Sequence, residues 1–245
     1  MKNQARRTKL EEGPLISIPG HIECAIKRRL NRFVVEISLK GQTARAHINN
    51  TGRLLELLVE GRKAACLPAA GGKTAYRLFA IRAKTAWALI DTQFQMRAFE
   101  QALGRGKIPW LSSWQLQKRN PRLGESVLDY VFTDEKGPGE LYLEVKSAVL
   151  RRGSYAMYPD CPTLRGQRHI RTLIDHARRG QRAAICFMAA FKGAAAFRPY
   201  ASGDPVIAAL LKEARGAGVE IRAVSMHFDG KGIQLDNPDL PVKIP

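Results

Sequence analysis

The sequence predicts an α/β (mixed α+β) protein of two domains, a small N-terminal OB-like β-barrel followed by a larger domain on a mixed β-sheet. The N-terminal third consists of short runs with strand character, separated by turn residues. From residue 92 onward, helical and strand patterns alternate. The chain has 245 residues, 45% of them hydrophobic, so it can bury a sizeable core without a disulfide or zinc ion.

Residues 1–14 are polar and charged, and we expect a flexible basic arm there. Strand patterns follow at 22–30, 32–39, 43–48, 62–68, 76–83 and 86–90, with a helix at 53–59. Short strands around one helix are typical of a closed OB barrel, to which we assign residues 15–90. Such barrels bind single strands through a basic groove with stacking aromatic rings. The barrel offers Phe33, Tyr76, Phe79 and Trp87, although aromatic side chains in strands more often belong to the core.

Residues 91–245 form the second predicted domain. It begins with a helix at 92–103 and an irregular stretch at 106–121. Strands at 127–133 and 141–149 are joined by a turn at 134–139. A helix at 163–179 carries apolar residues at helical spacing and has Thr163 as its N-cap. The apolar strand 183–190, a helix opening with Asp204 and Pro205, and a strand at 219–228 complete the mixed sheet.

The composition favours a polyanionic partner. The formal net charge is +18, and arginine, which matches phosphate geometry, outnumbers lysine. We expect the partner to be nucleic acid, with DNA first and RNA as the second candidate. The alternative is an arginine-rich surface that has no such partner. We expect no membrane partner, because neither a basic amphipathic helix nor an apolar run of about 20 residues is present. Scattered cysteines and a polar N-terminus indicate a cytoplasmic protein with reduced thiols.

Two acidic residues lie inside apolar strand patterns of the second domain, Asp129 at 127–133 and Glu144 at 141–149. A carboxylate there is costly to bury unless it is paired or binds a cation. Strand alternation puts Glu144 and Lys146 on one face, and the short turn brings Asp129 within reach of Glu144. Asp129 and Glu144 would bind Mg²⁺ or Mn²⁺, which activates water against a phosphodiester, and Lys146 would stabilise developing charge. This Asp…Glu-x-Lys pattern is that of the PD-(D/E)xK nuclease fold.

The helix at 163–179 is basic in its first turns, which contain Arg165, Gln167, Arg168, His169 and Arg171. A basic helix beside two carboxylates is suited to hold phosphates. We expect His169 to be a phosphate contact or a structural residue rather than a catalytic base. The alternatives are a solvated basic face for the helix and a surface ion pair for Glu144 and Lys146.

Four segments resemble the sugar fermentation stimulation protein A (SfsA) family. They are Asn-Thr-Gly at residues 50–52, Ser-Val-Leu-Asp-Tyr at 126–130, Glu-Val-Lys-Ser at 144–147, and Tyr-Pro-Asp-Cys-Pro-Thr-Leu-Arg-Gly-Gln-Arg-His-Ile at 158–170. The resemblance runs in order over residues 20–240. It implies an OB-like domain, a PD-(D/E)xK nuclease-like domain, DNA binding without strong sequence preference, and an association with regulation of sugar (maltose) metabolism.

By the same resemblance, the metal-site residues are Asp129, Glu144 and Lys146. The sequence departs from the family pattern at two places near them. Val127 stands where the family has arginine, and Asn120 stands near the place of a family glutamate. At the domain junction, Asp91 and Thr92 replace an Asn-Thr pair. The loss of one carboxylate would weaken metal binding.

Two functions follow as hypotheses. The first is a metal-dependent nuclease acting on DNA or RNA. The second is a non-specific DNA-binding protein regulating sugar metabolism, with a nuclease fold that is weak or inert. In both, the nucleic-acid contacts would be Asn50, Thr51, Gly52, Arg53, Arg165, Gln167, Arg168 and His169. The oligomeric state stays open, a homodimer included.

Overall fold

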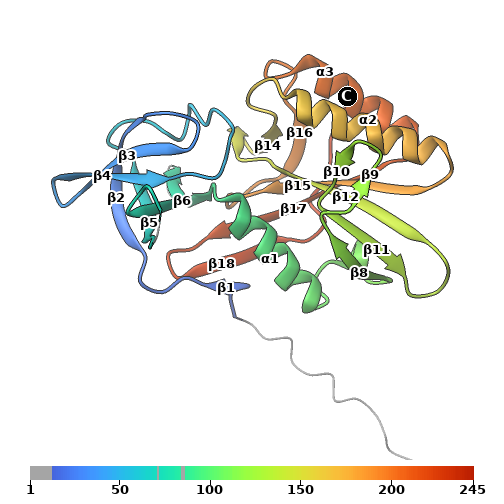
Figure 1. The fold of residues 1–245 in the computed structure, drawn as a ribbon, viewed down its shortest axis with the longest axis horizontal. Helices are drawn as coiled ribbons and strands as arrows, with labels where there is room; N and C mark the ends of the chain where they lie inside the picture. Colours follow the sequence, from blue (N-terminus) through green and yellow to red (C-terminus); the bar gives the residue numbers. More distant parts are fainter. Residues whose placement is uncertain (1–12, 71, 84–85) are drawn as a thin grey trace, which may run out of the picture.

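A computed structural model describes residues 13–70, 72–83 and 86–245 (Figure 1). The expected basic arm at 1–14 lies outside the described residues, apart from its last two positions. The predicted fold class is confirmed, because a closed barrel is followed by a mixed-sheet domain. Within the described part of the chain, no helix is long and apolar enough to span a membrane.

The barrel is built from β2 (Ile22–Arg29), β3 (Val34–Leu39), β4 (Gln42–His47), β5 (Lys63–Pro68), β6 (Tyr76–Ala83) and β7 (Ala86–Leu89). The strand order is β4-β3-β2-β5-β6-β7, and a parallel pairing of β4 with β6 closes it. Alternate residues such as Val35 and Ile37 are fully buried, while their neighbours are more exposed. This period of two explains why the strands could be located from the sequence.

The helix expected at 53–59 is absent, and turns occupy the segment instead. Leu54 has φ +52, a left-handed conformation that a right-handed helix cannot contain. The backbone N–H of Leu54 donates to Asp160 Oδ2 at 2.7 Å, so a residue far along the chain holds this conformation. The segment buries Leu54 and Leu57 and exposes Leu55 and Val59, so its apolar residues do not form the face of a helix.

The larger sheet contains β1 (Ile16–Ser17), β8 (Trp114–Arg119), β11 (Tyr130–Asp134), β12 (Glu140–Ser147), β15 (Arg182–Ala189), β17 (Glu220–Phe228) and β18 (Gly232–Asn237). Its order is β1-β18-β17-β15-β12-β11-β8, with β12, β15 and β17 parallel and the outer strands antiparallel. Smaller sheets are formed by β9 (Arg122–Leu123) with β10 (Ser126–Val127), and by β13 (Leu150–Arg152), β14 (Tyr155–Tyr158) and β16 (Ala196–Pro199).

Two sequence expectations for this sheet were wrong. The stretch 106–121 is not wholly irregular, since it contains a 3₁₀ turn (Pro109–Leu111) and strand β8. The strand expected at 127–133 is divided into β10 and β11, and Asp129 lies in the connection between them. In β8 the polar alternation of an edge strand masks the strand signal.

Three helices cover the described sheet: α1 (Thr92–Gly104), α2 (Leu164–Arg178) and α3 (Pro205–Gly216). Their N-caps are Asp91, Thr163 and Asp204, as the cap patterns at the last two had predicted. Helices α2 and α3 lie side by side on one face, and α1 lies on the other (Figure 1).

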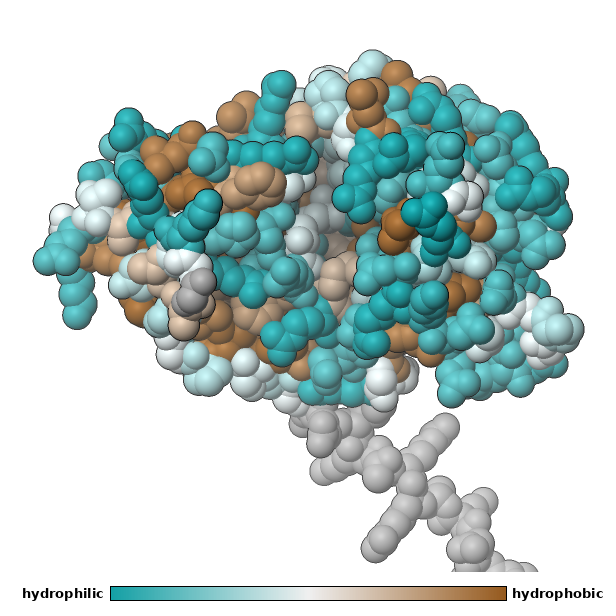
Figure 2. Space-filling model, in the orientation of Figure 1, coloured by the Kyte–Doolittle hydropathy of each residue, from teal (hydrophilic) through white to brown (hydrophobic). Residues whose placement is uncertain are grey.

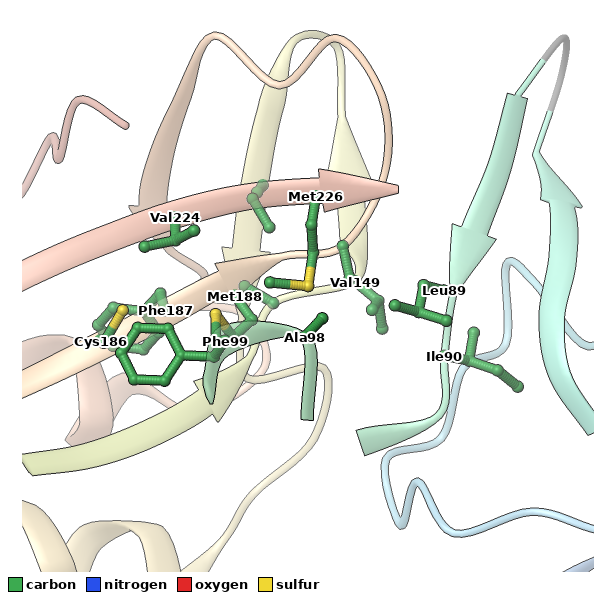
Figure 3. Close-up of a cluster of buried hydrophobic side chains, with 14 of the residues drawn as sticks. Leu89, Ile90, Ala98, Phe99, Val149, Cys186, Phe187, Met188, Val224 and Met226 are labelled. Carbon is green, nitrogen blue, oxygen red and sulfur yellow. The ribbon is translucent and has the colours of Figure 1, made fainter. Parts of the chain in front are cut away.

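The barrel and the sheet domain share a continuous hydrophobic core. The backbone N–H of Leu89 in β7 donates to Ala190 O at 2.8 Å, directly after β15. Figure 3 shows Leu89 at the end of a row of side chains that includes Val149, Met188 and Met226. The rings of Phe79 and Trp87 pack on Phe228, so these two aromatics are core residues and cannot stack on bases.

An ion pair stabilises the junction between the two domains. Arg77 of β6 holds the fully buried Asp91 through two hydrogen bonds of 2.5 and 2.6 Å, and Asp91 Oδ1 also accepts from Phe94 N at 2.9 Å. One carboxylate therefore both caps α1 and fixes it to the barrel.

Replacing Asp91 by Ala should lower the free energy of unfolding by about 3 kcal/mol, because it removes a cap and leaves Arg77 without its counter-charge. Urea unfolding followed by circular dichroism measures this loss. Glu213→Ala, which breaks the exposed ion pair with Arg178, is the control, with an expected loss below about 1 kcal/mol. Equal losses in the two variants would contradict the proposed coupling.

Candidate active site

The candidate site lies at the centre of the mixed sheet, between β12 and the first turns of α2. Asp129 precedes β11, and its Oδ2 accepts a hydrogen bond of 2.7 Å from the backbone N–H of Val145 in β12. Its own carbonyl accepts from the N–H of Asn120 at 2.9 Å. Asn120 has φ +52, so its role here is to make the turn beside Asp129, with an exposed side chain.

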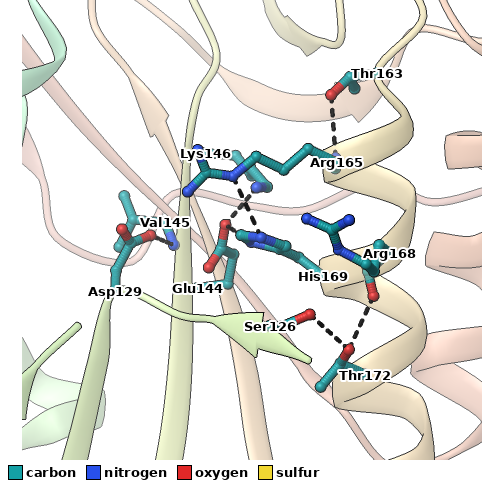
Figure 4. A network of polar contacts seen from close by, with 11 residues as sticks. Ser126, Asp129, Glu144, Val145, Lys146, Thr163, Arg165, Arg168, His169 and Thr172 are labelled. Atoms are coloured by element: carbon teal, nitrogen blue, oxygen red, sulfur yellow. Dashed lines mark hydrogen bonds and ion pairs between the residues drawn. The ribbon is translucent and has the colours of Figure 1, made fainter. Parts of the chain in front are cut away.

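Glu144 and Lys146 share one face of β12, as strand alternation predicted, and they form an ion pair through Glu144 Oε1. The pair is not on the surface, since Glu144 is 3% exposed. His169, buried on α2, places its Nδ1 2.6 Å from the same oxygen. Figure 4 shows these three side chains gathered beside Asp129, between the strand and the helix.

A second contact orients the His169 ring. Arg165 Nε–H donates to His169 Nε2 at 3.4 Å, so Nε2 is the acceptor and Nδ1 carries the proton given to Glu144. A chain of hydrogen bonds therefore runs from Arg165 through His169 to Glu144 Oε1 (Figure 4). Glu144 Oε2, although buried, has no hydrogen-bond partner in the described structure.

The charges of the cluster are strongly coupled. Burial, reinforced by the negative charge of Glu144, raises the pKa of Asp129 to about 7. Burial also opposes ionisation of Glu144, but the charge of Lys146 and the hydrogen bond from His169 outweigh it, and its pKa is lowered. Burial alone would lower the pKa of Lys146, but Glu144 reverses this and raises it. The site thus holds an ionised Glu144, a charged Lys146, and a second carboxylate short of positive charge.

The oxygen atoms left over fit a hard divalent cation. Glu144 Oε1 is occupied by Lys146 and His169, whereas Oε2 is buried and unpartnered. Asp129 Oδ2 accepts the N–H of Val145, and the raised pKa of Asp129 shows that its negative charge is not balanced by the positive charges nearby. Carboxylate oxygens are the donors that Mg²⁺, Mn²⁺ and Ca²⁺ take. Asp129 and Glu144 are therefore suitable ligands, although no group of three or more His, Cys, Asp or Glu ligands occurs among the described residues.

The residues of α2 that we expected to contact phosphate divide into an exposed group and a buried group. Arg165 and Arg168 are exposed, and Figure 4 shows them on the side of the helix that carries His169. Gln167 is buried, and its amide donates to both carboxylate oxygens of Asp204, at 3.3 and 3.0 Å. The burial of Gln167 argues against its expected contact with phosphate, and the burial of His169 favours the structural one of the two roles expected for it. Gln167 ties α2 to the N-cap of α3, and His169 is buried against Glu144.

The Asn-Thr-Gly segment of the barrel contains one buried residue, Asn50. Asn50 is buried and donates to Ile90 O at 3.0 Å and to Ser147 Oγ at 3.4 Å, next to Lys146. A Cβ on Gly52 would lie 2.8 Å from the Asp160 carboxylate, so only glycine fits there. Asn50 is thus a buried junction residue, which argues against its predicted contact with nucleic acid, whereas Gly52 is half-buried and Thr51 and Arg53 are exposed.

Two residues at this junction were quoted in a motif but not predicted as functional. Burial raises the pKa of Tyr158, and the charge of Lys146 partly opposes this rise; Asp160 accepts the backbone N–H of Leu54. Both belong to the Tyr-Pro-Asp segment at 158–160. A short polar segment between a strand and a capped helix was the signal that could have identified them.

The fold and the site define a two-domain protein: an OB barrel joined to a mixed sheet that carries an Asp…Glu-x-Lys cluster. The chain belongs to the sugar fermentation stimulation protein family. The family model described as "SfsA N-terminal OB domain" matches residues 28–90, and that described as "Sugar fermentation stimulation protein RE domain" matches residues 93–232. The resemblance inferred from the four motifs is confirmed.

The similarity to known proteins covers nearly the whole chain. A sugar fermentation stimulation protein homolog of Pyrococcus furiosus is 47% identical, covering 94% of this chain and 99% of the relative. One of Archaeoglobus fulgidus is 45% identical with the same coverage. The solved structure of Pyrococcus furiosus SfsA in complex with Ca²⁺ matches with a TM-score of 0.90 and 47% identity, over 95% of this chain and 100% of that one.

Proposed function

We propose that the protein is a nucleic-acid-binding nuclease that hydrolyses phosphodiester bonds of DNA or RNA with Mg²⁺ or Mn²⁺. The observation that carries the proposal is that the two carboxylate oxygens of Glu144 have different surroundings. Lys146 and His169 fix Oε1, which leaves Oε2 buried and unpartnered on a side chain whose charge, together with burial, raises the pKa of Asp129. The Pyrococcus furiosus relative described in complex with Ca²⁺ supports a divalent cation in this family.

Each side chain has a distinct role in this proposal. Asp129 and Glu144 would hold the metal, which supplies Lewis-acid polarisation of the phosphate and a more acidic water. Lys146, held on Glu144, presents an ammonium group that stabilises negative charge developing on the phosphate oxygens. His169 is a positioning residue, because it touches Glu144 and not the reacting atoms.

The proposed nucleic-acid surface is the hollow between the barrel and α2. Figure 2 shows hydrophilic side chains gathered along the α2 side of this hollow. Arg165 and Arg168 are exposed there, and Thr51 and Arg53 are exposed on the barrel. Phe33, 48% exposed and stacked on His47, offers a ring for a base on the barrel. The chain as a whole has a net charge of +18, and exposed arginines such as these bind nucleic-acid phosphates whatever the base sequence.

Replacing Arg168 by Ala should weaken binding to duplex DNA and reduce the slope of log K against log salt by about 0.9, the value of one phosphate contact. Fluorescence anisotropy over a salt series measures both. The control is Arg178→Ala on the same helix, which removes the same charge where Arg178 pairs with Glu213, and its slope should stay unchanged. A full slope in the Arg168 variant would contradict the contact.

The experiment that tests the function is incubation of the protein with single- and double-stranded DNA and RNA, in Mg²⁺, Mn²⁺ or EDTA. Cleavage that requires the metal supports the proposal. Absence of cleavage with every substrate and metal would refute it.

A second function is binding without cleavage, as a non-specific DNA-binding protein that regulates sugar metabolism. The observation that favours it is the small set of ligands, since a third carboxylate is not grouped with Asp129 and Glu144 among the described residues. It predicts salt-sensitive binding that EDTA does not alter. The cleavage assay separates the two functions.

A further inference from the structure

A pocket lies where the barrel meets the strand that continues beyond the candidate site. We call it the Leu55 pocket. Its walls come from the barrel segment at 53–57, from 149–152, and from Asp160, Phe191 and Tyr200. Its volume is about 140 Å³, close to the roughly 150 Å³ of an engineered cavity that accepts benzene. The space suits one planar ring.

The walls are apolar and the rim is cationic. Leu57, Val149 and Phe191 are buried, and Leu55 at the mouth is 73% exposed. Arginines surround these residues: Arg151 lies over the Phe191 ring at 5.1 Å, and Arg152 lies over the Tyr200 ring at 5.6 Å. Guanidinium groups above aromatic rings form surfaces on which a further planar ring can stack.

The charge of the rim favours an anion-bearing occupant. The pocket lining contains three arginines, Arg53, Arg151 and Arg152. It also contains two carboxylates, and each of them already has a partner. Glu56 pairs with Arg152, and Asp160 accepts the N–H of Leu54. The rim therefore keeps a net positive charge around an apolar pocket.

The pocket is also structurally linked to the candidate site. Leu150 follows Lys146 by four residues, at most about 14 Å of extended chain. Asn50, which hydrogen-bonds Ser147, and Asp160, two residues after Tyr158, connect the pocket wall to the surroundings of Lys146. The loop itself is held in a costly backbone conformation at Leu54 by Asp160, a feature that clusters at functional sites.

We propose that the Leu55 pocket binds one unpaired nucleobase, with the attached phosphate on Arg53 and Arg151. The proposal rests on the proposed function, because the nucleotide would be a neighbour of the one whose phosphate lies at Lys146. An apolar slot of one-ring size accounts for the base, and the cationic rim accounts for the phosphate. The same chemistry is offered by a single strand and by a free mononucleotide, which the experiment separates.

The test compares two variants of exposed apolar residues on the same barrel segment. Leu55→Glu places a carboxylate at the pocket mouth, whereas Val59→Glu adds the same charge at a position that is 43% exposed and outside the pocket. Binding of a fluorescein-labelled oligothymidylate is measured by anisotropy in EDTA, so that cleavage does not interfere. Thermal unfolding by circular dichroism verifies that both variants fold.

We expect Leu55→Glu to weaken binding at least about tenfold, equivalent to about 1.4 kcal/mol, and Val59→Glu to change it by less than about twofold because its charge is screened. An oligonucleotide carrying 4-thiothymine should crosslink to Leu55 or Tyr200 on irradiation. Competition by thymidine monophosphate that depends on Leu55 indicates a free nucleotide as occupant, and its absence indicates a strand.

Equal affinities of the two variants, or crosslinks only to residues outside the pocket, would overturn the pocket proposal and leave the proposed function intact. If the wild-type protein binds no oligonucleotide at all, the proposed function fails and the pocket proposal fails with it.

Discussion

Asp129→Asn and Glu144→Gln should each reduce metal-dependent phosphodiester cleavage by about 10³-fold or more, or about 4 kcal/mol of transition-state stabilisation. Each variant replaces a carboxylate oxygen that would hold the cation with an amide of the same shape. The measurement is single-turnover cleavage of a labelled strand at saturating protein, with Mg²⁺ varied over a wide range. Calorimetric titration with Mn²⁺ should show that both variants bind the metal more weakly.

His169→Asn provides the graded control. His169 acts through Glu144 Oε1, so its loss should cost about 10–100-fold, as expected for a residue that orients a ligand. Because the defect lies in ligand orientation, higher metal concentration should restore part of the activity. Cleavage that survives in Asp129→Asn and Glu144→Gln would show that the reaction occurs elsewhere in the protein.

The parts of the site that the sequence predicted correctly are those governed by local geometry. The shared face of Glu144 and Lys146 follows from strand alternation alone, and the ion pair between them confirms it. The N-cap of α2 at Thr163 likewise depends only on a side chain and the backbone three residues on. In such cases neighbouring residues determine the outcome, so spacing is sufficient.

The errors concern contacts between distant segments. His169 and Gln167 lie in a basic stretch, but α2 presents these two residues to Glu144 and Asp204, which belong to other elements. Helical periodicity does not tell which strand a helix face meets. Leu54 likewise adopts a left-handed conformation held by Asp160, which no local pattern around residue 54 encodes.

Asp129 lies in a different element from the one that the sequence predicted. The sequence interpretation placed it within a strand beside Glu144, whereas it lies between β10 and β11, where Asn120 N–H and Val145 N–H fix both its carbonyl and its carboxylate. The break in the strand frees the side chain from strict alternation. The position of the Asp129 carboxylate relative to Glu144 therefore depends on this connection. Burial and the negative charge of Glu144 raise the pKa of Asp129, and this affects the stability of the protein.

In the absence of metal, Asp129→Asn should make the protein more stable at pH 8 than the wild type, with a much smaller difference near pH 4. Burial and the charge of Glu144 raise the pKa of Asp129 to about 7 in the folded protein, against 3.8 as the ordinary value. Between these values the folded state holds a proton that the unfolded state has released. The contribution of this group to the wild-type free energy of unfolding is therefore most favourable below pH 4. It falls as the pH rises towards 7 and stays lowered above pH 7.

Asparagine has no proton to lose, and its Oδ1 can still accept from Val145 N–H, so the variant avoids this loss. The three-unit difference corresponds to at most about 4 kcal/mol, and we expect roughly half of it, a rise in Tm of about 4–8 °C for a protein of this size. Thermal unfolding in EDTA at pH 4, 6 and 8 measures the trend. Asp175→Asn, an exposed aspartate of α2, is the control and should show no such gain.

Adding Mg²⁺ at pH 8 should reverse the order, because the cation binds the protein that retains Asp129 more tightly than the variant and therefore stabilises it more. A stability difference that is independent of both pH and metal would contradict the electrostatic account of this carboxylate. The predicted trend means that an ionised Asp129 destabilises the wild-type protein when no cation is bound. The cation that we propose to bind at Asp129 would offset this cost.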